Sequence, residues 1–242
     1  MATKTAQSQR RKKAVETSTD QELALASSPM HLGPPYSGFS KEISYPADGY
    51  WNAVKIYPLS GQIVVQLGAV QQILEGIGSQ EAGFMKTFSV GSPGIYVFSL
   101  VTTINSLTLL PKSRDTIHAG ATIYLAVNQS DDRYDGAHKE WQIDTNYHYP
   151  IRNAYYPMIN LVVSATLAAN VNYKLHAGVG VNLEWTGNLF NAPPYGEIIA
   201  TLQSLTQSGP GATVQTAAKK GAKADKPRYF YEKYTDEEAA KM

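Results

Sequence analysis

VNYKLHAGVGVNLEW, residues 171–185, alternates apolar and polar side chains without interruption. Val171, Tyr173 and each odd position after them are apolar, whereas the even positions hold Asn, Lys, His, Gly and Glu. Successive side chains of a β-strand point to opposite faces, so this period of two predicts a strand with one buried face. Residues 141–149, WQIDTNYHY, repeat the pattern. Strands buried on one face only are typical of antiparallel sheets.

Further strands are predicted wherever β-branched and aromatic residues lie between turn signals. These segments are residues 42–45, 50–57, 62–67, 95–110, 121–127 and 159–167. Residues 95–110 hold either two strands or one long bent strand. Spacings of three and four predict one or two helical turns over residues 69–77, and residues 198–205 fit a short helix or a last strand. About eight or nine strands with few helices predict an all-β fold, an antiparallel β-sandwich of jelly-roll type.

Composition divides the chain of 242 residues into three parts. Residues 1–40 are predicted to form a disordered basic N-terminal arm and a Pro/Gly-rich linker, because they carry too few apolar residues to fold alone. Residues 41–207 are predicted to form the β-sandwich body. Residues 208–242 lose the hydrophobic pattern and are predicted to form a flexible linker and an extended C-terminal tail.

Basic residues at the start of the chain precede an acidic body, although the formal net charge of the whole chain is only +1. Such a cluster is either a solvated segment that aids solubility or an electrostatic arm that binds nucleic acid or an anionic membrane. An acidic body favours the arm, because a domain that bound polyanions throughout would itself be basic. The residues predicted to bind nucleic acid are Lys4, Arg10, Arg11, Lys12 and Lys13.

Aromatic residues cluster near the other end of the chain, beside a basic residue. Large aromatic side chains are enriched where one surface docks on another. We therefore expect this tail to contact a neighbouring subunit through Arg228, Tyr229, Phe230, Tyr231 and Tyr234.

Catalytic and metal-binding motifs are missing from the sequence. The chain has no cysteine, and its five histidines show no paired zinc-ligand spacing. Asp131, Asp132 and Asp135 resemble a cation-binding loop only loosely, because the alternation and final Glu of an EF-hand are absent. Glu140, Asp144 and Glu184 could supply the paired carboxylates of a glycoside hydrolase, but any β-rich protein with as many acidic residues would offer such a set. We expect no metal, no cofactor and no enzymatic activity.

Two long segments lack charge, residues 87–111 and 153–173. Pro, Gly, Asn and Thr interrupt both, so neither offers the roughly 20 apolar residues of a spanning helix. Buried strands are the better interpretation. No apolar segment follows the basic start, so no secretory signal is expected.

This layout resembles the jelly-roll capsid proteins of icosahedral viruses. The shared features are a basic arm at Arg10–Lys13, a Pro/Gly linker over residues 29–38 and a β-rich body with long loops. The resemblance implies a virion protein that assembles with copies of itself and with other capsid proteins. Its basic arm would face nucleic acid or an internal lipid membrane. Low charge, abundant Tyr and the lack of Cys would suit a virus from a hot environment.

Two other functions fit the same sequence. Residues 159–185, with their alternation, glycines and terminal Trp, resemble strands of a membrane β-barrel. The chain also fits a ligand- or carbohydrate-binding β-sandwich, because aromatic residues on residues 141–149 would stack sugars if they were not core.

Overall fold

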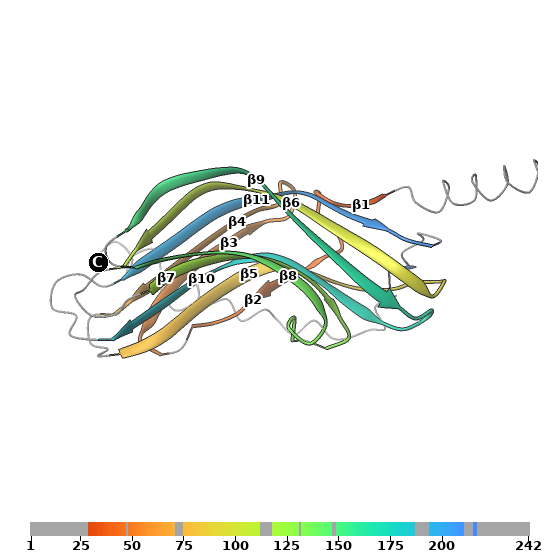
Figure 1. Cartoon of the computed structure of the whole chain (residues 1–242), viewed down its shortest axis with the longest axis horizontal. Helices are drawn as coiled ribbons and strands as arrows, with labels where there is room; N and C mark the ends of the chain where they lie inside the picture. The colour runs from red at the N-terminus through yellow and green to blue at the C-terminus, as the bar shows by residue number, and fades with distance from the viewer. Residues whose placement is uncertain are drawn as a thin grey trace, which may run out of the picture.

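In the computed structural model, the strands form two antiparallel sheets packed face to face (Figure 1). The structure describes residues 29–46, 48–70, 75–111, 118–130, 132–146, 149–186, 194–210 and 215–216. All regular elements within these ranges are strands, which confirms the predicted all-β sandwich. They are β1 Met30–Gly33, β2 Ser40–Ile43, β3 Tyr50–Tyr57, β4 Gln62–Ala69, β5 Glu75–Ser89, β6 Gly94–Leu110, β7 His118–Asn128, β8 Ala137–Asn146, β9 Ile151–Leu167, β10 Tyr173–Thr186, β11 Tyr195–Ser208 and β12 Gln215–Thr216.

Eight strands, β4 to β11, give the sandwich its topology. The first four pair with the last four in reverse order: β4 with β11, β5 with β10, β6 with β9 and β7 with β8, all antiparallel. Pairs of β11 with β6 and of β10 with β7 join them into two sheets, β4-β11-β6-β9 and β5-β10-β7-β8. A long hairpin rolled up in this way is the jelly roll that the strand count predicted.

Four further strands extend these sheets at one side. β3 pairs with β4, and β1 pairs with β11, which completes the six-stranded sheet A. β2 and β12 both pair with β5, which completes the six-stranded sheet B. β9 and β8 therefore form the opposite edges of sheets A and B.

The alternation of apolar and polar residues in β10 and β8 reflects one buried face, as the sequence predicted. Leu175, Val179 and Leu183 of β10 lie in the core, whereas Gly178 and Asn182 lie on the other face of sheet B. On β8, Trp141 and Ile143 pack against the core. The aromatic pattern at the start of residues 141–149 is therefore core packing and not a ligand-binding stripe; Tyr147 lies outside the described residues.

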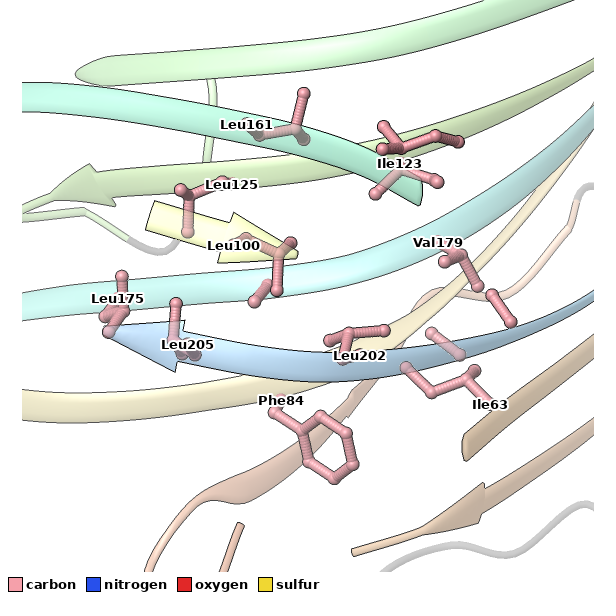
Figure 2. Packing of buried hydrophobic residues seen from close by; sticks show 14 of the residues in the cluster. Ile63, Phe84, Leu100, Ile123, Leu125, Leu161, Leu175, Val179, Leu202 and Leu205 are labelled. Atoms are coloured by element: carbon pink, nitrogen blue, oxygen red, sulfur yellow. The ribbon is translucent and has the colours of Figure 1, made fainter. Parts of the chain in front are cut away.

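The core lies between the sheets and takes large apolar side chains from both (Figure 2). Leu100, Leu202 and Leu205 enter it from sheet A, and Phe84 and Val179 enter from sheet B. All of these side chains are almost fully buried. Their burial is the main favourable term that holds the two sheets together.

The structure settles two alternatives that the sequence left open and contradicts one predicted element. Residues 95–110 form one long strand, β6, whose pairing with β9 shifts register near Thr102 and Ile104. Residues 198–205 belong to strand β11. The helix predicted over residues 69–77 is wrong at both ends, because Ala69 closes β4 and Glu75 opens β5. Strand pairing with β10 along all of β5 outweighs the local helical spacing there.

The sandwich also begins earlier than the sequence predicted. Residues 30–40 were expected to be a linker before a body starting near Lys41, yet β1 pairs with β11 and Tyr36 lies in the core. The Tyr36 ring stacks on Phe84 with 4.3 Å between centroids, and its hydroxyl donates to the Leu202 carbonyl at 3.2 Å. Burial raises the pKa of the Tyr36 phenol above its ordinary value. The Pro and Gly residues here shape a folded segment.

The predicted C-terminal boundary lies close to the end of β11 at Ser208, and β12 then adds two residues to sheet B. The basic arm and the aromatic tail lie outside the described residues. Within the described ranges no helix is long and apolar enough to cross a membrane.

We predict that Tyr36→Ala lowers the free energy of unfolding by about 3–5 kcal/mol, because it removes a buried aromatic ring. Tyr36→Phe, the matched control, keeps the ring and should cost only about 1 kcal/mol for the lost hydrogen bond. Urea unfolding followed by tryptophan fluorescence measures both. Equal, small losses would mean that residues 30–40 are not part of the cooperative fold.

Candidate interaction surfaces

The residues predicted to act from the two ends of the chain lie outside the described residues. This holds for the arm (Lys4, Arg10, Arg11, Lys12 and Lys13) and for the tail (Arg228, Tyr229, Phe230, Tyr231 and Tyr234). Their roles remain predictions. The candidate surfaces that the structure does describe belong to the sandwich itself.

The acidic loop before β8 is held by its own hydrogen bonds. Ser130 donates to Asp135 at 3.0 Å, and the Asp132 carboxylate accepts from the Tyr134 backbone at 2.9 Å. Asp131 lies outside the described residues. No cluster of His, Asp or Glu suited to a metal ion occurs in the described ranges.

Sheet A carries very little charge. Its strands hold only Lys55, Arg152 and Glu197 as charged residues. The outward positions of β6 and β9 are mostly Ile, Val, Ser, Thr, Asn, Tyr and Met, with the exposed Arg152 near the start of β9 as the charged exception; Ile95, Met158 and Val162 are exposed. Charged residues concentrate in sheet B, where β8 alone contains Lys139, Glu140 and Asp144. The low overall charge of the chain is therefore a property of one face of the sandwich.

β9 is the edge of sheet A farthest from β3. It pairs along one side with β6, and no other described strand pairs with its second side. The strand contains no charge from Asn153 to its end at Leu167, and Pro157 lies where the register with β6 shifts. Proline at such a position is typical of an edge strand. The ten residues after it, 158–167, run without interruption.

Other sheet edges carry features that discourage pairing with foreign strands. β8 has charges, β3 has Lys55 on its outward face, and β1, β2 and β12 are only four, four and two residues long. Charged residues and short edge strands are common protections against edge-to-edge association. β9 is long and, after Arg152 near its start, carries no charge, so it stands apart from the other described edges.

Part of the outer face of sheet B, over Gly83 and Gly178, is covered by the sheet's own side chains. Tyr124 of β7 lies flat across β10, with its hydroxyl over Gly178 and Gly83, and neither glycine leaves room for a Cβ beneath the ring. The Arg133 guanidinium stacks on this ring, 4.0 Å from its centroid, and pairs through both terminal nitrogens with the Glu81 carboxylate. Arg133 is only 7% exposed. This stack fastens the loop between β7 and β8 to the sheet.

This packing raises the pKa values of Tyr124 and Arg133. Burial and the charge of Glu42 raise the pKa of Tyr124 well above its usual value, so the phenol stays neutral. Burial alone would lower the pKa of Arg133, but the hydrogen bonds and charge of Glu81 raise it above its ordinary value. Arg133 therefore keeps its charge, and its ion pair with Glu81 acts as a structural clamp.

His176 lies in the same region. The alternation of residues 171–185 places it on the polar face of its strand, and the structure buries it to 1% exposure. Its Nδ1 lies 3.0 and 3.1 Å from the two carboxylate oxygens of Glu42. Because Glu42 comes from β2, this contact ties that short strand to β10. Sequence spacing offered no sign of it, since the partners are far apart in the chain.

A small aromatic platform lies on the outer face of sheet A. Trp51 of β3 lies over Gly68 of β4, where a Cβ would clash with the indole, and it stacks with Tyr195 of β11 at 5.8 Å between centroids. Trp51 is 43% exposed. Beside it, the Glu197 carboxylate accepts from the Tyr195 hydroxyl at 3.0 Å and from the Gln66 amide. Burial, then the hydrogen bond and charge of Glu197, raise the pKa of Tyr195 to about 12.

This platform joins a flat ring to hydrogen-bonding groups, which is the combination that suits a sugar ring. No local sequence pattern indicates this platform, because its residues come from three strands. The predicted carboxylates do not form such a site: Glu140 bonds Gln142 at 2.7 Å, and no hydrogen bond joins it to Asp144 or Glu184 within the described chain.

Comparisons with known proteins give only distant likenesses. No protein-family model matches the sequence, and no curated protein matches it. The enzymatically active domain of tailspike protein 4 of bacteriophage CBA120 shares 14% identity at a TM-score of 0.22; the match covers 69% of this chain but only 19% of that one. A cyclase from Fischerella sp. shares 17% identity at a TM-score of 0.24, over 72% of this chain and 74% of its own.

Two further structures are likewise distant. The mannan-recognising carbohydrate-binding module TmCBM27 shares 11% identity at a TM-score of 0.23, covering 75% of this chain and 96% of its own. Infectious bursal disease virus, Gx strain, shares 12% identity at a TM-score of 0.10, covering 76% of this chain and 45% of its own. Likenesses of this order do not distinguish between functions.

We predict that Arg133→Met destabilises the protein by about 3 kcal/mol, because it leaves the Glu81 carboxylate partly buried without its partner. The double variant Arg133→Met/Glu81→Leu, which removes both charges, should be more stable than the single variant. Thermal unfolding at neutral pH compares them. A double variant that loses as much as the two single variants combined would contradict the clamp.

Proposed function

We propose that this chain is a structural subunit of a virus particle, which assembles with copies of itself into an icosahedral shell. The observation that carries the proposal is the division of charge between the two sheets. Sheet A presents an outer face with few charges and, over residues 158–167 of β9, a long edge without charge, whereas Tyr124 and Arg133 cover part of the outer face of sheet B. One half of the sandwich is thus suited to contacts with other molecules.

Physical arguments favour protein partners for sheet A. Charged residues are depleted at the centres of protein–protein interfaces, where each buried charge costs desolvation energy. A face of Val, Ile, Thr, Ser and Gln can be covered without that cost. A jelly roll is also a shape that tiles through edges and loops, although fold alone is weak support for function.

The basic arm and the aromatic tail have roles in the same proposal. The arm, with Lys4 and Arg10–Lys13, faces the interior and offsets the charge of nucleic acid or of an internal lipid membrane. The tail, with Tyr229, Phe230 and Tyr231, reaches a neighbouring subunit and adds a linked contact to weak ones. Under this proposal the protein works in the virion through its surfaces and is not an enzyme.

A second function is favoured by one specific observation, the aromatic platform of Trp51 and Tyr195 beside Glu197. An exposed indole face with a neighbouring carboxylate and amide would stack and hydrogen-bond a sugar. Under this alternative the chain is a carbohydrate-binding β-sandwich. A purely structural role for Trp51 would be to cover Gly68, over which its indole lies.

We predict that the purified full chain forms particles much larger than a dimer. A variant with Arg10, Arg11, Lys12 and Lys13 changed to Gln should form them with less nucleic acid. Light scattering at low and high salt, with absorbance at 260 and 280 nm, measures both, because screening weakens phosphate contacts. Unchanged nucleic acid content in the variant would remove the arm's role, and a monomer under all assembly conditions would contradict the shell.

For the alternative, we predict that glycan binding would quench Trp51 fluorescence and raise the melting temperature of the wild type. Trp51→Ala should abolish both effects, whereas Tyr57→Ala, a change to another exposed aromatic of the same strand, should leave them intact. Titration with a panel of soluble plant and bacterial polysaccharides tests this. No response to any polysaccharide, or equal responses in both variants, would count against the platform.

A further inference from the structure

The free side of β9 has the properties of a strand-pairing site. Each residue of a strand directs its backbone N–H and C=O toward one side, so an edge strand presents a row of unpaired groups. In the described chain, the backbone hydrogen bonds outside the paired strands do not involve β9. Along residues 158–167 the outward side chains include Met158 and Val162, which are 72% and 49% exposed.

The ends of the described chain lie away from this edge. β1, which follows the arm, pairs with β11 on the side opposite β6 and β9. β12, which precedes the tail, pairs with β5 at the far edge of sheet B from β8. The sandwich therefore does not lead either end of the chain to β9, and an occupant from another molecule is the simpler expectation.

The sequence of β9 is suited to pairing with itself. Two identical antiparallel strands meet about a two-fold axis, so like charges near the axis would repel. No charge occurs between Asn153 and Leu167. With the axis at Val162, the outward face sets Val162 against its own copy and the Asn160 amide beside the Ser164 hydroxyl. On the inward face, Leu161 would meet Val163 and the larger Ile159 would meet the smaller Ala165.

We propose that β9 of one copy pairs antiparallel with β9 of a second copy about a two-fold axis at Val162, so that sheet A continues across the dimer. The proposal rests on the proposed function, in which copies of the chain assemble, and names one contact of that assembly. Main-chain hydrogen bonds join the two strands, and the uncharged side chains on both faces allow the approach. The partner is a second copy of this chain.

A single cysteine tests the contact, because the natural chain contains none. In Val162→Cys, the introduced thiols of two copies would meet at the axis, and mild oxidation of the full chain should give a covalent dimer on a non-reducing gel. Gln203→Cys is the matched control: it is exposed on β11 of the same sheet but lies away from the edge, and it should give no dimer. No cross-link in the first variant, or equal cross-linking in both, overturns the pairing.

Charge variants at the same position give a second test. Val162→Lys and Val162→Glu should each lose the β9 contact by repulsion, and mixing them should restore it to near the wild-type level. Because Val162 is half exposed, both variants should keep the wild-type fold. Among residues 158–167, amide hydrogen exchange of the N–H groups that point away from β6 should be fast in either variant alone and slow in the mixture. Slow exchange in a variant that is monomeric would mean that the same chain covers β9, and would overturn the proposal.

Failure of this inference is distinguishable from failure of the proposed function. Particles that form normally from Val162→Lys would leave a shell protein whose contacts lie elsewhere, and the β9 pairing would be wrong. A cross-linked Val162→Cys dimer that never forms larger particles would uphold the pairing and refute the shell.

Discussion

Pairing of the first half of the chain with the second half in reverse order is the constraint on which the rest of this sandwich depends. Because β7 pairs with β8 and β6 pairs with β9, the middle of the sequence lies at one side of both sheets. The outer strands of the long hairpin, with β1, β2, β3 and β12, collect on the other side. Backbone hydrogen bonding thus decides which strands become edges before any side chain is considered.

The two edge strands from the middle of the sequence, β8 and β9, differ in how far they oppose pairing with a foreign strand. β8 carries Lys139, Glu140 and Asp144, which oppose pairing with another strand, whereas β9 carries no charge over residues 153–167. The two outer faces differ in a similar way. Tyr124 and Arg133 cover part of the outside of sheet B, whereas the strands of sheet A carry few charges. An edge and a face that avoid charge together are the arrangement expected of a surface that is buried in an assembly.

The alternation of apolar and polar residues predicted those strands that bury one face only. The alternation of β10 and β8, and the turn signals around β3, fixed strand positions closely because one face of each strand is buried. β5 was missed, since its glycines and mixed polarity hide the alternation and its stability comes from pairing with β10. Tyr36 and β1 were read as linker because Pro and Gly usually mark loops; the contacts with Phe84 and Leu202 that bury them are long-range.

The candidate surfaces were still less accessible to sequence reasoning, for a reason that the topology explains. Trp51, Gly68 and Tyr195 become neighbours only because β3, β4 and β11 are adjacent in sheet A, and Glu81 meets Arg133 only because the β7–β8 loop folds over sheet B. The lack of charge in residues 153–173 was visible, but it suggested burial in general. Only the strand order shows that half of β9's backbone faces outward, so that the same lack of charge indicates a contact with another molecule.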